Sequence, residues 1–357
     1  MESPLWIEAH APELEDLPQP DLRRYLSRVR AGPINLVLHG PAGAGKTAAA
    51  RALARAVHDD PENALVEINV ADFFDRTKKE LRDDPRFAHF LTGEIPWVKQ
   101  VSTEQKQGLS KRYKSDWSKA EMINHVLKES ASTAPPAGGF RTILLDNAEA
   151  AREDFQQALR RIMERYHETT QFVVATRQPA ALIPAIRSRG FPVPVRAPTQ
   201  GEIVDVLRGI AEAEGVEYDE EGLEFVAGAA GGDLRNAILS AQTTAVGADE
   251  ITMNAAYETL QSVDADERVA EMLAAAEAGE FTDARSTLDE LLVEEGYSGE
   301  EVLADVLDVA RSRYSGDRLA AVHALAGEVD LDMAEGTSDR LHLSHLLAEL
   351  GRATGAA

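Results

Sequence analysis

The sequence predicts an α/β domain built on a parallel sheet, followed by two all-helical domains. Short apolar segments that read as strands alternate with helical stretches over the first 198 residues, which is the pattern of a parallel α/β sheet. A glycine-rich turn joins the first of these strands to an alanine-rich helix. Beyond residue 198 the chain is rich in Ala, Leu, Glu and Asp at helical spacing.

The segments of the α/β domain can be assigned individually. The predicted strands are residues 34–39, 65–69, 142–146 and 172–176, with a final strand within 191–198. Residues 46–57 and 155–166 are predicted to be helices. We therefore expect an α/β domain over residues 1–198, a small helical domain over 199–262 and a second helical domain over 263–357.

Composition narrows the class of protein. The 357 residues suffice for two or three domains, and the chain contains no apolar run long enough to span a membrane. It has no cysteine, which excludes disulfides and thiolate metal sites. The amino terminus lacks a basic start and an apolar stretch typical of a secretory signal. We expect a cytoplasmic protein.

The net charge is strongly negative, at -24, with 61 acidic against 37 basic residues. Every lysine lies between Lys46 and Lys128. Few lysines and abundant acids resemble the proteomes of salt-loving archaea. At molar salt the Debye length is about 3 Å, so repulsion from DNA would be largely screened. The charge therefore does not exclude a nucleic-acid partner.

The glycine-rich turn fits the Walker A phosphate-binding loop (P-loop), because it follows a predicted strand and opens a predicted helix. Its residues are Gly40, Pro41, Ala42, Gly43, Ala44, Gly45, Lys46 and Thr47. Backbone N–H groups of such a loop surround phosphate oxygens. We expect Lys46 to reach the phosphates and the Thr47 hydroxyl to bind Mg²⁺.

A second motif fits Walker B. Residues 143–146 form an apolar run that ends in Asp146. A carboxylate at the end of a buried strand can hold Mg²⁺ or one of its waters. The two motifs together predict a nucleoside triphosphate site.

Six segments carry a shared pattern, namely residues 5–8, 144–149, 155–166, 170–176, 182–189 and 232–238. In this order they resemble a single family, the small subunit of archaeal and eukaryotic replication factor C. The resemblance is close over residues 4–72 and 140–260 and looser over the C-terminal helices. It implies an α/β AAA+ nucleotide-binding domain with a helical lid, followed by an all-α collar.

The resemblance also implies a function. Family members are AAA+ ATPases of the clamp loader, which act in DNA replication. We therefore expect ATP and Mg²⁺ as cofactors, and other replication factor C subunits in a hetero-pentamer, the sliding clamp and primer–template DNA as partners. By position, Arg189 matches the arginine finger that acts on the ATP of a neighbouring subunit. Arg235 matches the sensor-2 arginine of the lid.

This sequence departs from the family pattern at the hydrolytic position. The residue after Asp146 is Asn147, where the family has Glu as the base that orients the attacking water. Asn cannot accept a proton as a carboxylate does. Glu149 would point to the same side only if the strand continued. Arg177 occupies the sensor-1 position, usually Asn. We expect this chain to bind ATP but hydrolyse it slowly.

The segment of residues 76–128 is basic, with 12 Lys and Arg against 7 acids. In the resembled family, helices of the first domain follow the DNA backbone. The expected DNA contacts are Arg76, Lys78, Lys79, Arg160, Arg161, Lys111, Arg112 and Lys114. Within residues 99–119, basic residues alternate with aromatic ones, which fits either DNA binding or a solvated insertion.

Two other functions remain open from the sequence. Asn147 is compatible with a non-hydrolysing structural subunit of the same loader. The motifs are also compatible with another AAA+ DNA-remodelling ATPase. An initiator of that kind should end in a winged helix, whereas residues 264–352 read as acidic helices.

Overall fold

The computed structural model describes residues 5–29, 32–83, 118–132, 139–261, 265–294, 297–336 and 338–355. The chain forms two compact units, Met1–Tyr257 and Glu258–Ala357. The division lies near the predicted boundary at residues 262 and 263. The predicted boundary at residues 198 and 199 falls inside the first unit and stays a prediction.

A five-stranded parallel sheet organises the first unit, with strand order β2-β3-β4-β1-β5. The strands are β1 (Leu36–His39), β2 (Leu65–Asn69), β3 (Arg141–Asp146), β4 (Thr170–Thr176) and β5 (Phe191–Pro194). Every residue of β4 is buried, because helices cover both faces of a parallel sheet. The predicted parallel α/β domain is confirmed.

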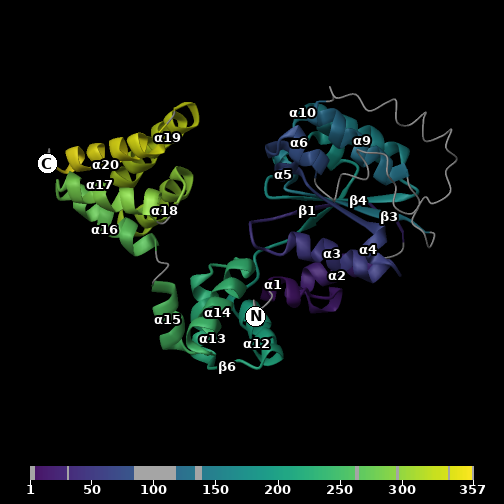
Figure 1. The fold of residues 1–357 in the computed structure, drawn as a ribbon, viewed down its shortest axis with the longest axis horizontal. Helices are drawn as coiled ribbons and strands as arrows, with labels where there is room; N and C mark the ends of the chain where they lie inside the picture. Colours follow the sequence, from purple (N-terminus) through teal and green to yellow (C-terminus); the bar gives the residue numbers. More distant parts are fainter. Residues whose placement is uncertain are drawn as a thin grey trace. The chain divides into compact units, whose positions relative to one another are not determined.

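Two layers of helices cover this sheet (Figure 1). The helices of one face share an apolar core and are α5 (Val70–Asp75), α6 (Lys78–Asp83), α9 (Lys119–Ser132), α10 (Glu153–Arg165) and α11 (Pro184–Arg187). On the other face, α2 (Pro20–Arg28) and α3 (Lys46–Val57) pack against the sheet through a second core. The short α4 (Pro61–Ala64) leads into β2.

A helical group follows the sheet, and its last helix runs past the end of the first unit at Tyr257; we call this group the lid helices. Its members are α12 (Gln200–Glu214), α13 (Glu220–Ala229), α14 (Leu234–Ala248) and α15 (Met253–Gln261), with the two-residue strands β6 (Glu217–Tyr218) and β7 (Glu250–Ile251). The helix α12 begins at a capping box in which Thr199 and Glu202 satisfy each other's backbone N–H groups.

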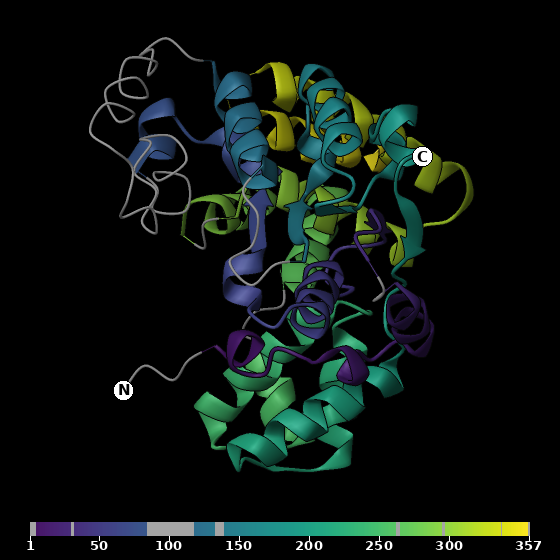
Figure 2. The ribbon, with the colours of Figure 1, turned by 90° about the vertical axis from the view of Figure 1, so that its right-hand side faces the viewer.

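The N-terminal helix α1 (Trp6–Ala9) packs on the lid helices, as the purple ribbon in Figure 2 shows. The side chain of Trp6 is buried in their core, and its backbone N donates to Gln242 Oε1 at 3.0 Å. A 3-10 turn (Leu14–Asp16) then leads to α2. The N-terminal segment therefore joins the lid helices to the α/β layer.

The second unit is all-helical around its own core. Its elements are α16 (Ala265–Glu277), α17 (Phe281–Asp289), a π-helical turn (Glu290–Glu294), α18 (Gly299–Arg313), α19 (Gly316–Glu335) and α20 (Asp339–Gly355). Arg313 and Arg318 both pair with Glu277, which ties α16 to α18 and α19. Within the ranges that the structure describes, no helix is long and apolar enough to cross a membrane.

Candidate nucleotide-binding site

The P-loop connects β1 to α3 and depends on its glycines. Gly43 has a φ of 62° and Gly45 a φ of 92°, a left-handed region that residues with a Cβ rarely adopt. At Gly40 any larger side chain would clash, since a Cβ would lie 1.8 Å from the carbonyl oxygen of Val195. The segment after β5 thus packs directly against the start of the loop.

The ammonium group of Lys46 lies inside this loop. Its Nζ donates to the carbonyl oxygens of Gly40 at 2.9 Å and Pro41 at 2.6 Å. Burial lowers the pKa of Lys46, an effect that the carboxylates of Asp146 and Glu149 oppose. Phosphate oxygens would offer stronger, charged acceptors to the same ammonium. The loop therefore fits a phosphate group.

The hydroxyl of Thr47 and the carboxylate of Asp146 meet at the carboxyl end of the sheet. Thr47 Oγ1 donates to Asp146 Oδ2 at 2.6 Å. A hydroxyl and a carboxylate are oxygen ligands of the kind Mg²⁺ prefers. Among the described residues, no three His, Cys, Asp or Glu side chains gather as a metal site. The pair thus fits a cation that also takes oxygens from a nucleotide.

Asn147 follows directly, in the left-handed conformation with φ 51° and ψ 45°. Its Nδ2 donates to Asn69 Oδ1 at 3.1 Å. The strand β3 therefore ends at Asp146, and a 3-10 turn (Ala148–Ala150) follows. The continued strand on which Glu149 would have pointed to the same side is absent, because the backbone turns at Asn147.

Glu149 is held at the end of β4 instead. Its Oε2 accepts from Thr176 Oγ1 at 2.8 Å and from Arg177 N at 3.2 Å, and its Oε1 accepts from Arg177 Nε at 2.8 Å. The side chain is only 10% exposed. Burial alone would raise the pKa of Glu149, but hydrogen bonds from Arg177 and Thr176 hold the pKa below its ordinary value.

Arg189 lies two residues after the end of α11. Its Nη1 donates to Ala185 O at 2.8 Å, and its Nη2 pairs with the Glu164 carboxylate on α10. A third of its side chain is exposed. The predicted finger is therefore anchored within its own chain, by hydrogen bonds to Ala185 and Glu164.

The lid helix α14 contacts the P-loop through its first turn. Leu234 N donates to Gly43 O at 3.2 Å, and Asp233 caps the helix by accepting from Asn236 N at 2.9 Å. A Cβ at Gly43 would lie 1.9 Å from Asp233 Oδ1. Arg235, the predicted sensor 2, is exposed in this turn. Asp233 was not predicted as a site residue, and its place beside the P-loop is visible only in the fold.

The predicted DNA contacts are only partly described by the structure. Lys78 and Lys79 are exposed on α6, and Arg161 is exposed on α10. Arg76 and Arg160 are half-buried. Both helices cover the same face of the sheet (Figure 1). The remaining three, Lys111, Arg112 and Lys114, lie outside the described residues.

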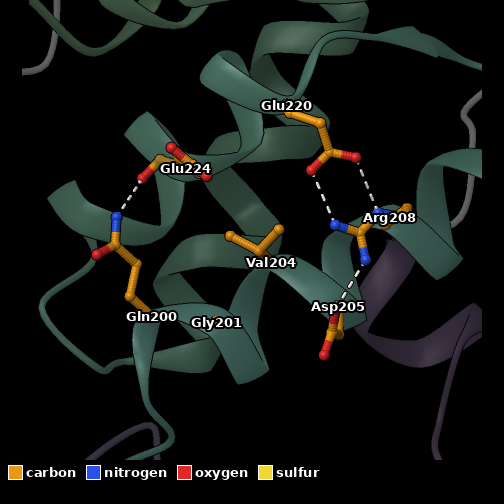
Figure 3. Close-up of a pocket in the computed structure, with 7 residues that line it drawn as sticks. All are labelled: Gln200, Gly201, Val204, Asp205, Arg208, Glu220 and Glu224. Atoms are coloured by element: carbon orange, nitrogen blue, oxygen red, sulfur yellow. Dashed lines mark hydrogen bonds and ion pairs between the residues drawn. The ribbon is translucent and has the colours of Figure 1, made fainter.

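A groove of about 440 Å³ lies between α12 and α13 (Figure 3), and none of the residues that line it is a predicted site residue. Arg208 dominates it, pairing with Asp205 at 2.7 Å and with Glu220 at 2.8 Å. Gln200 Nε2 donates across the groove to Glu224 O at 2.9 Å. The polar groups that line the groove are paired with one another, so they join the two helices and do not indicate a ligand site.

Comparisons with known proteins agree with this architecture. Residues 19–174 match the AAA ATPase domain, and residues 265–349 match the replication factor C C-terminal domain. The replication factor C small subunit of Methanocella arvoryzae is 30% identical over 97% of this chain and 96% of its own length. The replication factor C small subunit of Aeropyrum pernix is 31% identical over 97% of this chain and 95% of its own length. The chain belongs to the replication factor C small subunit family.

Membership in this family settles the broad function. The chain is an ATPase of the clamp loader, a complex of several replication factor C subunits, and its α/β domain binds a nucleotide. The predicted order of an AAA+ domain followed by an all-α C-terminal region is confirmed. Other AAA+ DNA-remodelling ATPases are not favoured, because the C-terminal match is to replication factor C.

Proposed function

We propose that this chain holds ATP and Mg²⁺ in its own site, hydrolyses the ATP slowly, and supplies Arg189 to the site of a neighbouring subunit in a hetero-pentameric loader. The loader would place the sliding clamp on primer–template DNA. The observation that carries the proposal is the contrast within one site. Lys46, Thr47 and Asp146 are positioned for binding, whereas Asn147 is paired with Asn69 where a general base is expected.

The binding half rests on three groups of this chain. Lys46 would exchange its two loop carbonyls for phosphate oxygens, and Thr47 and Asp146 would hold the cation. When bound, Mg²⁺ would offset negative charge on the phosphates. Gly43 and Gly45 allow the loop backbone to turn its N–H groups inward.

The slow hydrolysis in this proposal would have two causes. The Asn147 amide cannot take a proton from water at neutral pH. The nearest alternative base, Glu149, already accepts hydrogen bonds from Thr176 and Arg177. These bonds stabilise its charged form and reduce its basicity. Proton transfer is typically worth about 10² to 10⁴ in rate, so we expect turnover to fall by that order.

The role in a neighbouring site rests on Arg189. An arginine finger stabilises charge on the transferred phosphoryl group. Arg189 pairs with the partly exposed carboxylate of Glu164, so assembly would exchange that carboxylate for a phosphate. Since exposed ion pairs contribute only about 0 to 1 kcal/mol, this exchange is inexpensive.

DNA binding would use the exposed basic side chains of the face formed by α6 and α10. Reversing the charge of Lys78 and Lys79 together should weaken binding of primed DNA by the assembled loader and flatten its salt dependence. Reversal of Lys111, Arg112 and Lys114 tests the basic segment in the same assay. Unchanged affinity and salt slope would remove the altered residues from the interface.

The proposal is tested by following binding and chemistry in one sample. The purified chain is titrated with ATP carrying a fluorescent ribose label, with and without Mg²⁺, and the bound nucleotide is then analysed over time. We expect saturable, Mg²⁺-strengthened binding and a nucleotide that stays triphosphate over many minutes. Rapid conversion to diphosphate by the chain alone would overturn the slow-hydrolysis proposal. No binding would overturn the ATP site.

A further inference from the structure

One buried side chain outside the nucleotide motifs contacts the P-loop. Gln19 is 1% exposed and lies immediately before α2. Its Nε2 donates to the carbonyl oxygen of Ala44 in the loop at 2.8 Å and to that of Arg196 at 3.0 Å. The two acceptors come from segments far apart in the chain, and both become linked through this single amide.

The orientation of this amide follows from its neighbours. Backbone carbonyls only accept hydrogen bonds, so both contacts require the nitrogen of the Gln19 amide. Its two hydrogens are then used, one for each carbonyl. Apolar side chains fix the position of the residue, since Leu17 and Leu22 are buried in the same core as Ala44. Gln19 is therefore held in place from both sides.

The contact with Ala44 bears on phosphate binding. A trans peptide is planar, so the carbonyl of Ala44 and the N–H of Gly45 point in opposite directions. The chain has no cis peptide among its described residues. Since Gln19 draws the Ala44 carbonyl toward the core, the Gly45 N–H faces the inside of the loop, where phosphate-binding loops use such groups.

The contact with Arg196 reaches the connection to the lid helices. Arg196 follows β5, and α12 begins four residues later, at Gln200. The same connection presses on the other end of the loop, where Val195 O abuts Gly40. Gln19 and Gly40 thus hold the connection against both ends of the P-loop.

We propose that Gln19 is a positioning residue for the nucleotide, which sets the Ala44–Gly45 peptide for phosphate binding and ties the loop to the lid connection. This inference rests on the proposed ATP site. Gln19 itself touches no phosphate in this scheme, because it acts through the Ala44 carbonyl. An apolar residue of similar size would leave two buried carbonyls without donors and free the peptide to rotate.

The test compares Gln19→Leu with Gln171→Leu in the full-length chain. Gln171 is also fully buried and donates to a backbone carbonyl, that of Ile34, at 2.8 Å. It lies near the start of β4, at the end of the sheet opposite the P-loop. Both substitutions should lower the melting temperature. Affinity for fluorescent ATP and ADP with Mg²⁺ is then measured for each.

We expect Gln19→Leu to lower the affinity for both ATP and ADP about tenfold, which is the effect of one lost buried hydrogen bond. Gln171→Leu should leave both affinities within about twofold of wild type. If the leucine variant fails to fold, Gln19→Asn takes its place, because it keeps the amide on a shorter side chain. This variant should also lower the affinity for both nucleotides. Equal affinities for wild type and the Gln19 variants would overturn this inference alone. A wild type that binds neither nucleotide would overturn the ATP site and the inference with it.

Discussion

The nucleotide site has a phosphate end, at Lys46, Thr47 and Asp146, and a hydrolytic end, at Asn147 and Glu149. The two ends differ in the partners to which their side chains are hydrogen-bonded. At the phosphate end, Lys46 donates to two loop carbonyls and Thr47 donates to Asp146, and these are contacts that a nucleotide and its cation can replace. At the hydrolytic end, Asn147 and Glu149 are bonded to partners outside the loop. We therefore expect this P-loop domain to retain nucleotide binding while its turnover is reduced.

The largest effect is expected at Arg189, the proposed arginine finger. Arg189→Ala should lower the steady-state ATPase rate of the assembled loader by about 10³ where its neighbour depends on the finger. Nucleotide affinity of the isolated chain should not change. Arg187→Ala is a matched control from the same segment. An unchanged loader ATPase rate would show that Arg189 is not the finger.

Removal of the Lys46 ammonium group from the P-loop should weaken nucleotide binding. Lys46→Ala is expected to weaken ATP binding by about 100-fold, because charge-assisted hydrogen bonds to phosphate are lost. Fluorescent-nucleotide titration measures this. Lys128→Ala, on α9, is the control and should bind normally. Full affinity in Lys46→Ala would contradict the assignment of the loop.

The smallest effect concerns the stability of the hydrolytic end. The folded-state pKa of Glu149 is depressed, so its contribution to the free energy of unfolding is present above the unfolded pKa and is lost as pH falls through the folded pKa. Glu149→Gln should therefore flatten the acid side of the stability profile, below about pH 4.5. Urea denaturation at several pH values measures it. An unchanged slope would mean that the pair with Arg177 does not hold Glu149.

Much of the fold was predictable because its signals are local. Residues 46–57 and 65–69 form the helix and strand with the bounds predicted for them, since a glycine-rich turn and an apolar run mark their ends. The C-terminal helices were predicted from the helical spacing of Ala, Leu, Glu and Asp beyond residue 198. The salt adaptation suggested by the composition stays a prediction, and comparing folding in low and molar KCl would test it.

The contacts that shape the site were not predictable from local pattern. Asn147 ends β3 by adopting a left-handed conformation, which the apolar run before it does not reveal. Gln19 and Arg196 meet across 177 positions in the chain. A glutamine beside prolines reads as an exposed turn, and only the fold shows that it is buried under the P-loop.

The central claim, that Asn147 separates binding from turnover, is tested most directly by single-turnover hydrolysis in Asn147→Glu. ATP affinity and the rate of bound-ATP cleavage are measured together in wild type, Asn147→Glu and the control Asn147→Gln. We predict similar affinities in all three, and faster cleavage, by about 10² or more, only in Asn147→Glu. Equal and fast cleavage in wild type and Asn147→Glu would contradict the account.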